Sequence, residues 1–251
     1  MTEQNHPDRV LLALLYISTA VTGLIDAVSF LGLGHIFTAN MTGNIVVLAF
    51  ATAGKQSLSV PRSLSALAAF IVGPLISGRI AASIRFEAIR KLAKVAFGIE
   101  ALLLLSATLA AIGLNDASVN SSHLYAVILL TALAMGFRNA AVRKMAVPDL
   151  TTTVLTMTVT GLAADSSLAG GTNSRWQRRL SSALLMFLGA AAGALLVKHS
   201  LALPLAVATL SSFGCLAVLC GVEMVPRAGT ERTDRTPSSY AAADEYWRIH
   251  S

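Results

Sequence analysis

Long apolar blocks dominate the chain and predict its main elements. They lie at about residues 10–31, 62–80, 93–114, 122–143, 179–197 and 201–224. A block of roughly 18 or more mostly apolar residues is long enough to cross a bilayer as a helix. One such block can be a buried helix of a soluble protein, but six of them predict an all-α integral membrane protein.

Two shorter and more polar segments, at about 36–54 and 149–164, interrupt this pattern. They contain "TANMTG" (38–43) and "TMTVTG" (156–161), in which polar and apolar residues alternate. In an extended stretch such polar residues all point one way, whereas on a helix they spread around its circumference. We therefore expect unwound, cavity-lining segments, because non-helical backbone at membrane depth must face protein or water. The alternative is a helix whose Thr hydroxyls bond to its own carbonyls and whose Asn mediates helix packing.

The chain also repeats itself. "GLIDAVSF" at 23–30 matches "GFRNAAVR" at 136–143, "TANMTG" matches "TMTVTG", and "SALAAF" at 65–70 matches "SALLMF" at 182–187. Three matches in the same order indicate two halves of one design. We expect a single transmembrane domain over 10–225, with repeat one at about 10–114 and repeat two at about 122–225.

Basic residues between the blocks predict the topology. The loop at 79–94 carries five basic residues against Glu87, whereas the loop at 115–121 carries none. If both short segments are re-entrant, the strongly basic loops and both termini lie in the cytoplasm, as the positive-inside rule requires. Three full spans per half then invert the second repeat relative to the first. The alternative, eight full spans, divides the basic loops between the two faces.

Composition supports the membrane assignment. Only 13% of the residues are charged and 55% are hydrophobic, with a mean hydropathy of +0.68, whereas soluble domains carry about 25% charged residues. The net charge of +6 does not indicate nucleic acid, since the basic residues lie between the spans. Residues 1–9 form a polar N-terminal tail. Residues 226–251 are expected to form a polar, disordered cytoplasmic tail.

Asp26 lies deep in the first block, where an ionised carboxylate costs about 2.5–3.5 kcal/mol on insertion scales. Thr22 and Thr19 share its helix face and form a polar stripe with it. One interpretation is an ion or proton ligand beside a binding site. The other is a structural carboxylate that is hydrogen-bonded to the neighbouring polar segment.

Asn139 holds the corresponding place in the second half, next to Arg138. Arg138 could bind an anionic group or pair with Asp149, but we expect it to be an interface residue whose charged end reaches water. Glu100 is expected to face the interface or to pair with a base.

The predicted substrate-binding set combines these residues with the polar positions of the two short segments. Its members are Asp26, Thr38, Asn40, Thr42, Gly43, Asn44, Arg138, Asn139, Asp149, Thr153, Thr156, Thr158, Thr160 and Gly161. We expect no metal site or cofactor, because Cys215 and Cys220 point in different directions on one helix without a neighbouring ligand. No hydrolase or metalloprotease motif is found, so no enzyme and no catalytic residues are predicted.

Two stretches resemble a known family. "GLIDAVSFLGLGHIFTANMTGN" and "GFRNAAVRKMAVPDLTTTVLTMTVTGLAAD" are similar to the signature stretches of the YoaK family of bacterial membrane proteins, a domain of unknown function (number 1275). The resemblance covers about residues 10–225. It implies a multi-spanning protein of the bacterial inner membrane and no particular substrate or reaction.

The polar breaks and the repeat favour a small-solute transporter or channel-like protein with its site where the two short segments meet. The expected partners are the lipid bilayer, an unknown small solute and, as a further option, a second copy of the chain. An anion or a small polar solute suits the Thr and Asn lining and Arg138, and a proton-coupled mechanism would use Asp26. The alternative is a non-transporting membrane protein such as an assembly partner, sensor or tolerance factor.

Overall fold

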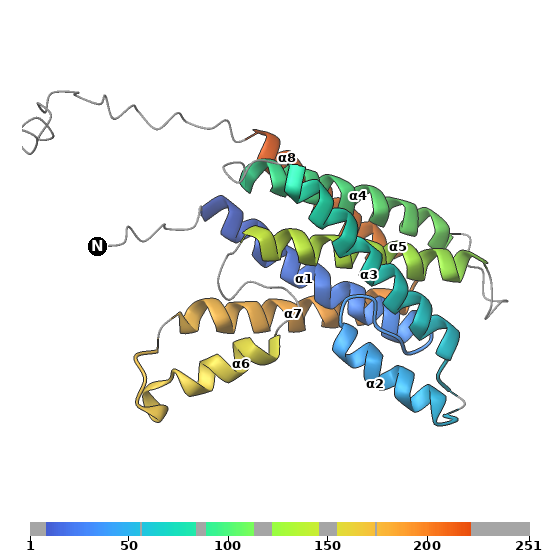
Figure 1. The fold of residues 1–251 in the computed structure, drawn as a ribbon, viewed down its shortest axis with the longest axis horizontal. Coiled ribbons are helices and arrows are strands. Elements are labelled where there is room, and N and C mark those ends of the chain that lie inside the picture. Colours follow the sequence, from blue (N-terminus) through green and yellow to red (C-terminus); the bar gives the residue numbers. More distant parts are fainter. Residues whose placement is uncertain are drawn as a thin grey trace, which may run out of the picture. The chain divides into compact units, whose positions relative to one another are not determined.

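The computed structural model describes residues 9–55, 57–83, 89–112, 122–145, 155–173 and 175–221, and within these ranges the regular structure is helical (Figure 1). The elements are α1 (Arg9–Gly32), α2 (Met41–Thr52), α3 (Val60–Ser83), α4 (Ile89–Ile112), α5 (Ser122–Met145), α6 (Leu155–Ala164), the short 3-10 turn η1 (Ser167–Ala169), α7 (Trp176–Val197) and α8 (Ala202–Gly221). The predicted tails, apart from Arg9, lie outside the described residues. The second compact unit of the chain, residues 222–251, lies outside them too.

Six of the described helices are long and apolar enough to cross a membrane. At 1.5 Å per residue, helices of 20–24 residues are about 30–36 Å long, which matches the hydrocarbon core of a bilayer. Many of their exposed side chains are large and apolar, as lipid contact requires. Examples are Ile71, Leu75, Leu102, Leu109, Phe187, Leu195 and Leu210. The prediction of an all-α integral membrane protein is confirmed.

The two remaining helices, α2 and α6, have 12 and 10 residues. Lengths of about 18 and 15 Å cover only about half of the hydrocarbon core, so six long spans fit the chain better than eight. Figure 1 shows that α2 runs back toward the end of the bundle at which α3 begins. It also shows α6 running toward the end at which α7 begins. This is the course expected of short, broken segments.

The predicted unwinding of these segments is confirmed in part only. Thr38 and Asn40 lie in the non-helical connection that precedes α2. The prediction is wrong for Thr42, Gly43 and Asn44, which form the first turns of α2, and for residues 156–161, which are helical throughout. Backbone hydrogen bonds within a short helix satisfy these peptide groups at membrane depth better than an extended strand without a partner would.

Each long helix packs against particular partners: α1 packs against α7, and α3 packs against α5. Helix α4 contacts both α5 and α8. Glycines allow the backbones to approach closely at both crossings. A Cβ on Gly23 would clash with the Met186 carbonyl oxygen, and a Cβ on Gly136 would clash with the Phe70 carbonyl oxygen. The predicted match between Gly23 and Gly136 thus corresponds to two equivalent packing roles.

Helices α1 and α5 form the interior of the bundle, and α3 and α7 are largely exposed. The interior face of α1 carries a stripe of buried polar residues, namely Ser18, Thr19, Thr22, Asp26 and Ser29. Thr19 and Thr22 donate to the carbonyl oxygens four residues before them, which satisfies their hydroxyls within the helix. The polar stripe predicted around Asp26 therefore faces protein and is shielded from lipid.

Candidate solute-binding cavity

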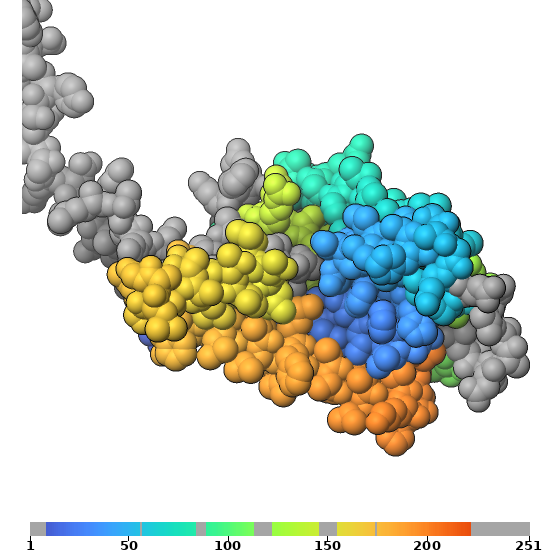
Figure 2. Space-filling model, turned by 90° about the horizontal axis from the view of Figure 1, so that it is seen from below, coloured from blue at the N-terminus to red at the C-terminus, as the bar shows by residue number. Residues whose placement is uncertain are grey.

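A cavity of about 510 Å³ lies where α2 and α6 approach α1 and α7. Figure 2 shows α2 in blue and α6 in yellow on the same face of the molecule, with α7 in orange beside them. The lining residues are Thr22, Asp26, Asn40, Thr42, Gly43, Leu155, Thr156, Val159, Thr160 and Met186. Binding cavities of roughly 300–1,000 Å³ are typical for small molecules, so this space is large enough for a small solute.

Asp26 lines the cavity and also binds the backbone of the connection that precedes α2. Its side chain is only 7% exposed, and Oδ1 accepts hydrogen bonds from the backbone N–H groups of Ala39 and Asn40, both at 3.2 Å. The hydrogen bonds expected by the structural interpretation of Asp26 are therefore present, and its role as an ion or proton ligand stays a prediction. Both bonds end on Oδ1, so among the described residues Oδ2 has no hydrogen-bond donor.

The beginning of α2 is fixed by two asparagines. Asn40 caps the helix, since its Oδ1 accepts from the Gly43 N–H at 3.2 Å, as an N-cap residue does. Asn44 accepts from the Phe37 N–H and donates to the Ser63 carbonyl oxygen on α3. Both the oxygen and the nitrogen of the Asn44 side chain are thus hydrogen-bonded, and the bond to Ser63 holds α2 against α3. It does not line the cavity.

Helix α6 presents one polar face to the cavity and another to the protein. Thr156 and Thr160, four residues apart, lie on the cavity side, whereas Thr158 is buried. At the far end of the helix, Arg179 donates to the Gly161 carbonyl oxygen and to Asp165, both at 2.6 Å. A Cβ on Gly161 would lie 2.8 Å from the Arg179 guanidinium carbon, so this glycine serves packing.

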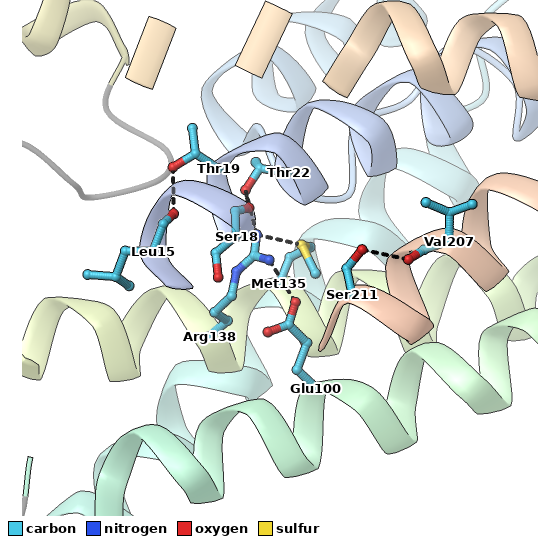
Figure 3. Close-up of polar contacts among 9 residues, drawn as sticks. All are labelled: Leu15, Ser18, Thr19, Thr22, Glu100, Met135, Arg138, Val207 and Ser211. Atoms are coloured by element: carbon cyan, nitrogen blue, oxygen red, sulfur yellow. Dashed lines mark hydrogen bonds and ion pairs between the residues drawn. The ribbon is translucent and has the colours of Figure 1, made fainter. Parts of the chain in front are cut away.

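The predicted interface position of Arg138 is wrong. Its side chain is 1% exposed, and its Nη1 lies 2.6 Å from the Glu100 carboxylate on α4 (Figure 3). Nη2 donates to the hydroxyl of Thr22 and to the sulfur of Met135. A charge inside a bundle is tolerated when it is paired, which is why Arg138 turns inward to Glu100. The pairing alternative for Glu100 is confirmed, and Asp149 lies outside the described residues.

Six residues of the predicted site therefore meet at the cavity: Asp26, Asn40, Thr42, Gly43, Thr156 and Thr160. Thr38 is fully buried beside it, and Asn139 is half-buried in α5. Neither lines the cavity. Thr153, like Asp149, lies outside the described residues. The prediction omitted Thr22, Leu155, Val159 and Met186, of which only Thr22 had a signal, because it lies one turn before Asp26.

The described residues contain no group of three or more His, Cys, Asp or Glu side chains that could hold a metal ion. What the geometry offers is a set of hydroxyls, an amide and one carboxylate around a space of solute size.

A bundle of six long apolar helices with two short helices that border a polar cavity defines a multi-pass, all-α membrane protein. The chain belongs to the family described as "Protein of unknown function (DUF1275)", whose model matches residues 14–219. The UPF0700 transmembrane protein YoaK of Bacillus subtilis (strain 168) is 34% identical to it over 158 residues. This match covers 61% of the chain and 66% of the relative, slightly less than two thirds of the relative's length. No solved structure matches the chain.

Proposed function

We propose that this protein is a small-solute transporter or channel-like protein of the bacterial inner membrane, with the cavity between α2 and α6 as its solute site. The observation that supports this most directly is the cavity lining. The side chains of Thr42, Thr156 and Thr160 remain exposed at the cavity, whereas packing alone would bury and satisfy such hydroxyls. The proposal concerns binding and passage of a solute and includes no reaction.

An inverted repeat is part of the proposal. The first span of repeat one, α1, packs on the second full span of repeat two, α7, and the first span of repeat two, α5, packs on the second full span of repeat one, α3. In Figure 1, α1 and α5 run in opposite directions. Transporters built in this way bind solutes at the interface between repeats, beside broken helices. The cavity, bordered by α2 from one half and α6 from the other, has this location.

The glycine contacts refine the register of the repeat. The contact of Gly23 with Met186 is repeated by that of Gly136 with Phe70. In the sequence match, Phe70 aligned with Phe187, so the packing shifts that alignment by one residue. The basic loops further support a cytoplasmic location of both termini.

The proposal is tested by uptake into proteoliposomes that contain the full chain. The probes are 4-aminobutanol, butane-1,4-diol and 4-hydroxybutyrate, which share one length and carry charges of opposite sign or none. We expect at least one probe to enter faster than into empty liposomes. Thr160→Trp, which fills the cavity, should abolish this uptake. Met157→Trp should not, because Met157 is exposed on another face of α6 and does not line the cavity.

A non-transporting role remains the second candidate, because Asp26 and Asn44 both serve to hold α2 in place. This alternative predicts that none of the three probes enters above background and that Thr160→Trp behaves like Met157→Trp. That result would contradict the transport proposal.

A further inference from the structure

We infer that the solute bound in the cavity carries a positively charged group, which pairs with the Asp26 carboxylate. The inference rests on the proposed function and deepens it by assigning the class of solute. Asp26 is the only ionisable side chain among the described residues that line the cavity. The other polar groups there are hydroxyls and one amide, which can accept or donate without adding charge.

The buried guanidinium of Arg138 does not neutralise this site. Arg138 acts electrostatically on Asp26, but its guanidinium lies 2.6 Å from the Glu100 carboxylate and does not line the cavity. When both carboxylates are ionised, Asp26, Glu100 and Arg138 together carry one negative charge. An anionic solute would meet that charge at short range, in surroundings of low dielectric constant where like charges repel strongly. Of the two expected solutes, an anion and a small polar solute, the anion is therefore disfavoured, and a solute with a cationic group is favoured.

The N-terminus of α2 does not reverse this preference for a cation over an anion. The N-terminus of a helix attracts anions, yet here protein oxygens already accept from the N–H groups of Ala39, Asn40 and Gly43. Asp26 binds the N–H groups of Ala39 and Asn40, and the Asn40 side chain binds that of Gly43. Asp26 Oδ2 has no such donor among the described residues and is the acceptor that a protonated amine can use. Thr156 and Thr160, on the α6 side of the cavity, offer further acceptor oxygens.

The inference is tested with Thr160→Cys, in the full chain with Cys215→Ala and Cys220→Ser. The reaction rates of a trimethylammonium-ethyl and a sulfonatoethyl methanethiosulfonate with the introduced thiol are compared, each relative to its rate with free 2-mercaptoethanol. We expect the cationic reagent to be favoured at least about tenfold, and Asp26→Asn to remove most of this preference. Asp165→Asn is the matched control, because Asp165 pairs with Arg179 and does not line the cavity.

Protection by a solute provides a second measurement. Millimolar 4-aminobutanol should slow the reaction of the Thr160→Cys variant with the neutral methyl methanethiosulfonate, and butane-1,4-diol and 4-hydroxybutyrate should not. An equal or anionic preference, or a preference that Asp26→Asn leaves unchanged, overturns the inference, as does the absence of protection by 4-aminobutanol. Uptake of the neutral or anionic probe in proteoliposomes would still support transport, so the two proposals can fail separately.

Discussion

At the scale of single residues, Asp26 combines a structural role with a place in the cavity wall. Asp26→Ala removes the acceptor for the N–H groups of Ala39 and Asn40. We expect a loss of about 1–3 kcal/mol in stability, the usual cost of unsatisfied buried donors. Asp26→Asn keeps a carbonyl oxygen in place and should lose much less. Thermal unfolding of the purified protein in detergent measures both changes, and equal losses would show that the hydrogen bonds contribute nothing.

The pair formed by Arg138 and Glu100 makes a second prediction at this scale. Removing one partner, as in Arg138→Met or Glu100→Gln, leaves the other charge buried without its counter-ion and should cost about 3–5 kcal/mol. The double variant should be more stable than the less stable of the two single variants, since it removes both charges. A double-mutant cycle from thermal unfolding gives the coupling energy. Additive losses would contradict the paired arrangement.

The sequence predicted the cavity residues better than the ion pair, for a physical reason. Neutral polar side chains in short, apolar segments must face protein or water, so Thr42, Thr156 and Thr160 could be recognised individually. The partner of Arg138 could not be recognised in this way, because Glu100 lies on a different span and no local spacing connects them. The same holds for Gly161, whose packing against Arg179 depends on how α6 lies on α7.

At the scale of helices, the alternation of threonines was misinterpreted. Residues 156 and 160 are four apart and share a helix face, while Thr158 is buried on another face. A helix can therefore carry a polar residue at every second position when one of its faces lines a polar cavity and another is buried against protein. The expectation of an extended segment assumed that every other side of α6 would meet lipid.

The glycines at the helix crossings make a prediction at this scale. Gly23→Ala and Gly136→Ala each place a Cβ against a carbonyl oxygen of the facing helix, so each should destabilise the protein by about 1–3 kcal/mol, as overpacking does. Gly214→Ala on α8 is the control, because no other atom lies within 4 Å of its Cβ position. It should leave stability unchanged or raise it by up to about 1 kcal/mol. Thermal unfolding measures all three, and equal behaviour would contradict the close crossings.

At the scale of the whole molecule, the short helices and the basic loops together predict on which side of the membrane each loop lies. With α2 and α6 re-entrant, Lys55 lies outside and Leu168, which is 98% exposed, lies in the cytoplasm. In a variant without the native cysteines, Lys55→Cys should react with a membrane-impermeant maleimide in intact spheroplasts. Leu168→Cys should react only after permeabilisation. Labelling of both from the same side would contradict the inverted arrangement.

The ion pair also has a consequence for biosynthesis. Glu100 and Arg138 lie on α4 and α5, which follow each other along the chain. Each charge alone opposes membrane insertion of its span by about 2.5–3.5 kcal/mol on insertion scales. Once paired, the two spans can leave the translocon as a helical hairpin that carries no net buried charge. A chain that stops after Asn120 should therefore insert α4 less efficiently than the full chain, and Glu100→Gln should restore insertion of the truncated form. The order of the spans along the chain thus allows the ribosome to deliver a charge and its counter-ion one after the other.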